Sequence, residues 1–378
     1  MIYLDHAATT PVRPEVRAAM EPLLTDRFGN PSSVHTIGQQ ARALLDGARD
    51  TVARCLGARA EEIVFTSGGT EADNLALIGS FLARRAEGKH HLITVQTEHH
   101  AILESAEFLE ELEAEVTLLP VDGSGRVDPE AVRAAIRPET FLVSVMAANN
   151  EIGTVAPLAE IAAVCREAEV PLHTDAVQGM GLLEMRVDAP YVDLLSLSAH
   201  KIYGPKGVGA LYVRRGTPLK PILHGGSQER RRRGGTENIV GIVALARALE
   251  LAVAERQTEA ARQTALRDHL IVAIEGSVPG AVLNGDRVHR LPNNVNFSFP
   301  GLESDTLLLG LDLEGVCASS GSACAAGAVE PSHVIQAISE NHARGISAVR
   351  LTVGHSTTEA EVDAAAEIVA RVVARLRE

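Results

Sequence analysis

Residues 141–146, with the sequence FLVSVM, are apolar at every position except Ser144. A strand that carries hydrophobic side chains on both faces is typical of a sheet that helices cover on both sides. Similar short runs recur along the chain, and segments of helical periodicity lie between most of them. The strand candidates are residues 62–66, 91–95, 116–120, 140–146, 171–174, 193–197 and 207–213. This alternation predicts an α/β fold with a mostly parallel, mixed sheet.

The last third of the chain has a different pattern. The elements predicted there are a long helix, two strands and a closing amphipathic helix, at residues 237–275, 293–299, 348–353 and 359–377. We therefore expect two domains. Residues 15–255 are predicted to form the large domain, and residues 1–14 together with 256–378 a small α+β domain.

Composition and charge exclude several classes of function. The chain has 378 residues, 46% of them hydrophobic, and a formal net charge of −14. Such a charge repels phosphate backbones and anionic membranes, so we expect neither nucleic acid nor a membrane as a partner. The only basic cluster, residues 230–233, is predicted to lie at a dimer interface or the active-site entrance, or else to be a solvated charge run. Without a signal peptide or a long apolar run, the sequence predicts a soluble cytoplasmic protein.

The cysteines and histidines do not form a metal-binding or disulfide pattern. Four unevenly spaced cysteines are too few for a disulfide framework, and adjacent histidines point in different directions, so no metal site is expected. Cys55 and Cys165 fit apolar helical positions and are predicted to be small core residues. Cys324 instead lies in a segment rich in Ser, Gly and Ala, residues 319–329, which we expect to be a mobile loop presenting a reactive thiol.

Polar residues follow three of the predicted strands, at the sheet edge where α/β proteins bind ligands. Gly69 and Thr70 could begin a phosphate-binding helix, or could simply form a capped glycine turn. Asp175 could pair with a protonated ring nitrogen or act as a helix cap, and Lys201 could form a Schiff base or be a surface charge. Together they match what pyridoxal 5′-phosphate (PLP) requires: a phosphate cradle, a partner for the ring nitrogen and an amine.

Motifs along nearly the whole chain resemble those of the cysteine desulfurases of the NifS/IscS type. In order they are YLD (3–5), FGNPSS (28–33), FTSGGTE (65–71), TEH (97–99), NNEIG (149–153), SAHKIYGPKG (198–207), QER (228–230), GTEN (235–238) and SSGSAC (319–324). Their collinear order makes coincidence an unsatisfactory explanation. The resemblance implies a PLP-dependent transferase of fold type I, with the longer, group I form of the loop that carries the cysteine.

The resemblance also implies roles for individual residues. Lys201 would hold PLP as a Schiff base and move protons, and His99 would stack on the ring and act as an acid and base. Arg350 would bind the substrate carboxylate, with Asn150 close to both the carboxylate and the cofactor. The remaining cofactor contacts would come from Asp175 at the ring nitrogen, Gln178 at the ring oxygen, and Gly69, Thr70, Ser198, His200 and Thr236 at the phosphate, with Thr236 supplied by the second subunit of a homodimer.

The implied reaction takes sulfur from L-cysteine, releases L-alanine and leaves a persulfide on Cys324. The sulfur would then pass to an acceptor such as an iron-sulfur scaffold protein, or toward thio-cofactor or tRNA synthesis. The chain stops soon after its last predicted helix, whereas IscS-like members use a further tail to dock the scaffold, which leaves that docking open. Alternatives are selenocysteine lyase or cysteine-sulfinate desulfinase activity, an ordinary aminotransferase, or a non-catalytic sulfur-trafficking scaffold.

Overall fold

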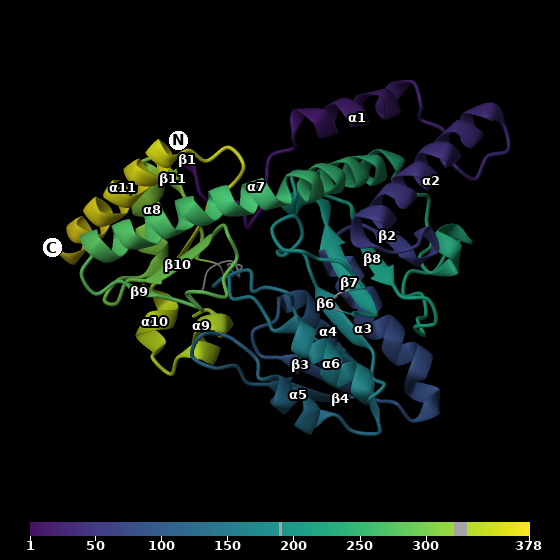
Figure 1. Ribbon diagram of the computed structural model, residues 1–378, viewed down its shortest axis with the longest axis horizontal. Coiled ribbons are helices and arrows are strands. Elements are labelled where there is room, and N and C mark those ends of the chain that lie inside the picture. The colour runs from purple at the N-terminus through teal and green to yellow at the C-terminus, as the bar shows by residue number, and fades with distance from the viewer. Residues whose placement is uncertain (189–190, 321–330) are drawn as a thin grey trace.

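A seven-stranded sheet forms the centre of the larger part of the molecule. The computed structural model describes residues 1–188, 191–320 and 331–378 (Figure 1). The strands lie in the order β2 (Ile63–Thr66), β8 (Gly209–Val213), β7 (Leu194–Ser198), β6 (Leu172–Asp175), β5 (Thr140–Ser144), β3 (His91–Val95) and β4 (Glu115–Leu119). Strand β8 runs antiparallel to both of its neighbours, β2 and β7, and the other neighbouring strands pair in parallel. The predicted mostly parallel α/β sheet is confirmed, and every predicted strand end lies within two residues of the observed one.

Helices cover both faces of this sheet, as its apolar strands require. Alternate residues of a strand face opposite sides, so Val64 packs with α3 and α4, whereas its neighbours Ile63 and Phe65 pack with α2, α6 and α7. The helices are α1 (Pro14–Thr25), α2 (Thr36–Leu56), α3 (Gly69–Arg84), α4 (His100–Glu111), α5 (Pro129–Ala135), α6 (Leu158–Glu167) and α7 (Ile239–Ser277). Short 3-10 helices are η1 (Ala60–Glu62), η2 (Arg85–Glu87), η3 (Ala199–Lys201) and η4 (Gln228–Arg231).

A second hydrophobic core lies in the C-terminal part, around two small sheets. Strands β12 (Ala348–Thr352), β10 (Asn294–Ser298) and β9 (Val282–Leu283) form one antiparallel sheet, and β1 (Ile2–Tyr3) pairs with β11 (Val316–Cys317) in the other. The helices here are α8 (Ser304–Leu313), α9 (His333–Ile338), α10 (His342–Ile346) and α11 (Glu359–Arg377). Leu4 packs in this core, which supports grouping the N-terminal segment with the small domain. The domain limits at residues 15 and 255 stay a prediction.

Helix α7 connects the two cores along its 39 residues (Figure 1). Its first half buries Ile242, Leu245 and Leu249 in the core beside the large sheet. Its second half buries Leu270 and Ile274 in the C-terminal core. One continuous helix therefore joins the large sheet to the C-terminal part of the molecule. From this part, the N-terminal segment and strand β12 reach the edge of the large sheet. No described helix is both long and apolar enough to cross a membrane.

A buried ion pair within the chain lies directly before the basic segment 230–233. Arg49 donates two hydrogen bonds to the Glu229 carboxylate, at 2.7 and 2.6 Å, and both side chains are at most 5% exposed. Glu229 also accepts a hydrogen bond from the Phe65 backbone N–H at 2.9 Å. Glu229 and Arg230 adopt left-handed backbone conformations, with φ of 44° and 54°. This ion pair therefore holds a strained loop against strand β2.

Breaking this pair should cost far more stability than breaking a surface pair. Replacement of Glu229 by Gln leaves the Arg49 charge buried without a counterion, so we expect a loss of about 3–5 kcal/mol in unfolding free energy. The control is Glu21→Gln, because Glu21 pairs with Arg17 at the surface and such a pair contributes about 0–1 kcal/mol. Urea unfolding of both variants measures the difference. Equal losses would contradict the structural role of the Arg49–Glu229 pair.

Candidate active site

A cavity of about 340 Å³ lies where the carboxyl ends of β6 and β7 meet the N-terminal segment and β12. Sequence-predicted residues from six separate segments line it: Gly69, Thr70, His99, Asn150, Asp175, Gln178, Ser198, His200, Lys201 and Arg350. Six further residues complete the described lining: Ala7, Ala8, Asp73, Met146, Val177 and Ser319. Thr236 does not line this cavity, and Cys324 lies outside the described residues, as does most of segment 319–329.

Lys201 ends the 3-10 turn that directly follows β7, and its amine points into the cavity wall. Its Nζ donates hydrogen bonds to the carbonyl oxygens of Ala7 and Ala8, at 2.5 and 2.8 Å. Burial lowers the Lys201 pKa from 10.5 to about 8, with the Arg350 charge acting in the same direction. A lysine with such a pKa has a much larger neutral fraction near neutral pH than an ordinary lysine, so it can attack an aldehyde. The surface-charge alternative for Lys201 is therefore wrong.

This pKa predicts how fast the cofactor-free protein takes up PLP at different pH values. Only the neutral amine attacks the aldehyde, so the rate should rise with pH and level off above about 8. A lysine with an ordinary pKa would give a rate still rising toward 10.5. Stopped-flow absorbance of PLP binding measures the midpoint. A rate that keeps rising in proportion to hydroxide well beyond pH 8 would contradict the assignment.

Asp175 is the last residue of β6 and lines the same cavity. Its Oδ1 accepts a hydrogen bond from the Val177 N–H at 2.8 Å, and no helix begins there, so the helix-cap alternative is wrong. Burial raises the Asp175 pKa, whereas His99 and Lys201 lower it. His99 caps α4 through Nδ1, which accepts the Ala101 N–H at 3.0 Å, and burial lowers the His99 pKa. A cationic ring nitrogen in this cavity would favour the Asp175 carboxylate.

The start of α3 offers free backbone donors to an anion. The helix begins at Gly69, and its cap residue Gly68 has no side chain to accept the first N–H groups. Thr70 lies inside the helix, so the alternative of a Thr-capped turn is wrong. A Cβ at Gly69 would lie 2.8 Å from Val177 Cγ2, which explains why glycine stands there. The unsatisfied N–H groups of a 16-residue helix therefore face Ser198, as a phosphate site requires.

Arg350 projects from the middle of β12 into the cavity. Its Nη2 pairs with Asp5 Oδ1 at 2.9 Å, and its Nη1 donates to the Asn150 carbonyl oxygen at 2.9 Å. Its Nε has no hydrogen-bond partner among the described residues, although the atom is buried. Asp5 thus orients a guanidinium that keeps an unused donor for a small carboxylate. Sequence reasoning included Asp5 in a motif but did not predict this contact.

The N-terminal segment supplies the wall opposite the large sheet. Gln178 Nε2 donates to the Ala7 carbonyl oxygen at 3.0 Å, the same oxygen that Lys201 contacts. His200 Nδ1 hydrogen-bonds with Thr9 Oγ1 at 3.2 Å. These contacts join residues more than 170 positions apart, so no local pattern could reveal them. The small side chains of Ala7 and Ala8 were the only available signal.

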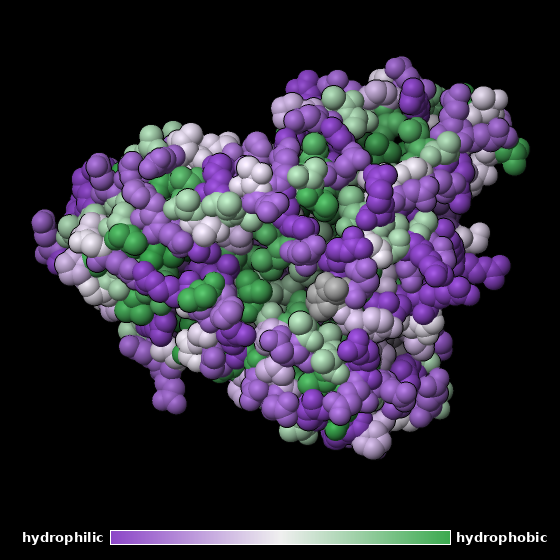
Figure 2. Space-filling model, viewed as in Figure 1, coloured by the Kyte–Doolittle hydropathy of each residue, from purple (hydrophilic) through white to green (hydrophobic). Residues whose placement is uncertain are grey.

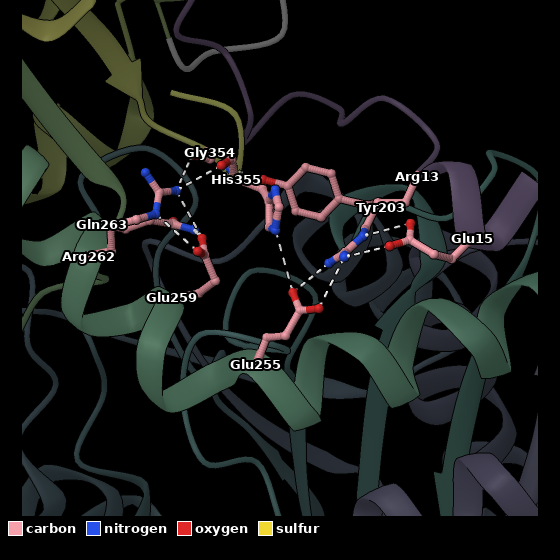
Figure 3. Close-up of polar contacts among 9 residues, drawn as sticks. All are labelled: Arg13, Glu15, Tyr203, Glu255, Glu259, Arg262, Gln263, Gly354 and His355. Atoms are coloured by element: carbon pink, nitrogen blue, oxygen red, sulfur yellow. Dashed lines mark hydrogen bonds and ion pairs between the residues drawn. The ribbon is translucent and has the colours of Figure 1, made fainter. Parts of the chain in front are cut away.

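Lys201 also lines a smaller cavity, of about 50 Å³, and Figure 3 shows the polar contacts among other residues around it. Glu255 of α7 bonds with Arg13 at 2.6 Å and lies 3.5 Å from His355 Nε2. Arg262, one α7 turn beyond Glu259, donates to the carbonyl oxygens of Gly354 and His355. These bonds fix the segment after β12, and with it the strand that carries Arg350, against α7. Among the described residues no group of three or more His, Cys, Asp or Glu side chains is placed to hold a metal ion.

The arginines of segment 230–233 largely bond within their own chain. Arg230 and Arg232 donate to the carbonyl oxygens of Ala60 and Glu61, at 3.2 and 3.1 Å. Arg233 pairs with Glu71 in the first turn of α3, at 2.8 Å. This links the loop that bears Thr236 to the phosphate-binding helix start. Arg232 and Arg233 are only partly exposed, so the interpretation as a solvated charge run does not describe these two arginines, whereas Arg230 and Arg231 are exposed.

Comparisons with known proteins agree over the whole chain. The aminotransferase class-V family model matches residues 2–365. The cysteine desulfurase IscS of Dictyoglomus turgidum is 49% identical over 376 residues, covering 100% of this chain and 95% of the relative. A solved NifS-like protein superimposes with a TM-score of 0.93 at 35% identity, covering 99% of both chains. The structure of SspA in complex with cysteine has a TM-score of 0.83 at 39% identity and covers 93% of this chain and 99% of that one. The chain therefore belongs to the class-V aminotransferase family, among the cysteine desulfurases of the NifS/IscS type.

Proposed function

We propose that the protein is a PLP-dependent cysteine desulfurase that converts L-cysteine to L-alanine and retains the sulfur as a persulfide on Cys324. The observation that carries this proposal is the position of Lys201, whose buried amine lies in one cavity with Asp175 and Arg350. The relatives named as cysteine desulfurases and the cysteine-bound structure support the choice of substrate.

The residues of the cavity fit PLP. The uncapped start of α3 supplies backbone donors for the phosphate, Asp175 supplies a carboxylate for the ring nitrogen, and Lys201 supplies an amine for the aldehyde. When bound, PLP acts as an electron sink for the charge that develops at the substrate α-carbon. His99 lines the same cavity and would stack on the ring.

The chain's own residues would then perform the remaining steps. Arg350 would bind the substrate carboxylate, with its Nε as the unpaired donor, and Lys201 would act as the base that takes the α-proton. The Cys324 thiolate attacks the substrate sulfur, forming an S–S bond while the carbon–sulfur bond breaks. The electron pair of that bond remains with the carbon skeleton, which leaves as alanine after protonation.

A homodimer is part of this proposal. Thr236 is exposed and lies in a loop outside the described cavity of its own chain, so it is available to a partner subunit. Exposed apolar residues gather on the protruding α1–α2 segment, where Leu24, Phe28 and Val34 are 64%, 68% and 89% exposed (Figure 2). Exposed apolar clusters of this kind mark interaction surfaces.

A protein acceptor, such as an iron-sulfur scaffold, would receive the sulfur from Cys324.

Substrate comparison tests the proposed reaction. The purified PLP-loaded protein is given L-cysteine, L-selenocysteine or L-cysteine sulfinate in turn, and alanine formation is measured for each. We expect the highest kcat/KM for L-cysteine, with a thiol-dependent sulfur product. A higher kcat/KM for either other substrate would favour the lyase or desulfinase alternative. A colourless protein without bound PLP would favour the non-catalytic scaffold.

A further inference from the structure

A second carboxyl group, that of Asp73, lies in the cavity beside Asp175. Asp73 belongs to the second turn of α3 and is 1% exposed, yet it lines the cavity. Its Oδ1 has no hydrogen-bond partner among the described residues. Burial, and next the Asp175 charge, raise the Asp73 pKa well above its usual value. An acidic side chain in this position needs a physical explanation, because an unpaired buried carboxylate is costly.

The neighbouring histidine does not neutralise Asp73 as a cation. His173 precedes Asp175 by two residues on β6, so both side chains lie on the same face of the strand. The His173 ring hydrogen-bonds with Ser144 Oγ at 2.8 Å and Ser196 Oγ at 3.0 Å, and its Nε2 lies 3.7 Å from Asp73 Oδ1. Burial lowers the His173 pKa to about 3. The imidazole is therefore neutral and fixed by two hydroxyl groups.

Three carboxyl groups share this enclosed region, and they cannot all be ionised. The third is Glu98, whose Oε1 accepts the Met146 N–H at 2.6 Å and whose pKa is raised by burial and then by Asp175. Of the three carboxyl groups, Asp175 is the one whose pKa is lowered by His99 and Lys201, which favours its charged form. The negative charge is consequently expected on Asp175, while Asp73 and Glu98 keep their protons.

We propose that Asp73 is a positioning residue for the cofactor ring: it remains a neutral carboxylic acid next to His173, and leaves Asp175 as the carboxylate that pairs with the ring nitrogen. A neutral acid stabilises a neighbouring anion through its dipole and its O–H group. A second carboxylate would instead compete with Asp175 for the ring proton. This inference rests on the proposed function only in requiring PLP.

A matched pair of variants tests this role without any substrate. Asp73→Asn keeps the shape and polarity of a neutral acid, whereas Asp73→Leu keeps the branched side-chain skeleton but removes every polar atom. The readouts are the absorbance of bound PLP across a pH titration and the PLP dissociation constant. Thermal unfolding of the cofactor-free variants reports any general loss of stability. We expect Asn to preserve the wild-type midpoint and affinity, and Leu to shift the midpoint by about one pH unit and weaken PLP binding about tenfold.

Two outcomes would overturn the proposal. If the Asn variant shifts the midpoint as far as the Leu variant, Asp73 acts as a carboxylate. If neither variant shifts it, Asp73 does not influence the ring. Should the Leu variant fail to fold, Asp73→Ala removes the same polar atoms with a smaller side chain, and an unchanged midpoint there would also overturn the proposal. A wild-type protein that binds no PLP would contradict the proposed function instead, so the two failures are distinguishable.

Discussion

Replacement of Lys201 by Ala is expected to lower alanine formation from L-cysteine by about 10⁴-fold or more. The variant loses both the covalent attachment of PLP and the base that removes the α-proton, and general acid–base catalysis alone contributes up to about 10⁴-fold. The cavity offers no second lysine, because Lys201 is the only one among its described lining residues. Steady-state alanine production measures the loss.

The matched control is Lys220→Ala, which removes an exposed lysine outside the cavity. This variant should retain wild-type activity and wild-type borohydride trapping of PLP. The Lys201 variant should bind PLP without covalent trapping, because it keeps Asp175 and the start of α3. Covalent trapping of PLP in the Lys201 variant would show that a different amine holds the cofactor.

The second large effect is expected for Cys324→Ala, which should lower sulfur release from L-cysteine by about 10²-fold or more, because the covalent nucleophile has no substitute. Burial argues against two of the other cysteines as replacements. Burial raises the pKa of Cys165 to about 12, and it also raises the pKa of Cys55. Neither thiol readily forms the thiolate that attacks sulfur. Sulfide release with a reducing thiol measures the effect.

Cys55→Ala serves as the control, since Cys55 is a half-buried residue of α2. It should leave sulfur release unchanged. The Cys324 variant should keep the wild-type absorbance of bound PLP, because the residues that line the described cavity are intact. Normal sulfide release by the Cys324 variant would mean that another group accepts the sulfur.

The strands of the large sheet could be predicted closely because a strand buried on both faces needs apolar side chains, and the local sequence shows them. A strand such as 140–144 is buried on both faces, and its three central residues, Phe141, Leu142 and Val143, are accordingly apolar. Asp175 and Lys201 could be found because they follow such strands directly. The helix over 237–275 was also predictable, and the observed α7 spans Ile239–Ser277.

Contacts between distant segments could not be predicted in this way. Asp5 orients Arg350 across 345 positions, and the Ala7 carbonyl meets Lys201 across 194. Asp73 lies inside a helix with no local sign that its side chain reaches a cavity. Such contacts depend on how the N-terminal segment and α3 pack, which periodicity does not encode.

The central claim joins Lys201 chemistry to sulfur transfer onto Cys324, and intact-protein mass spectrometry tests it most directly. The PLP-loaded wild-type protein is incubated with L-cysteine, and alanine is quantified in the same sample. The account predicts a mass increase of one sulfur atom per chain, located on Cys324, removed by a reducing thiol and matched by one alanine. Alanine formation without a reducible sulfur adduct on Cys324 would contradict it.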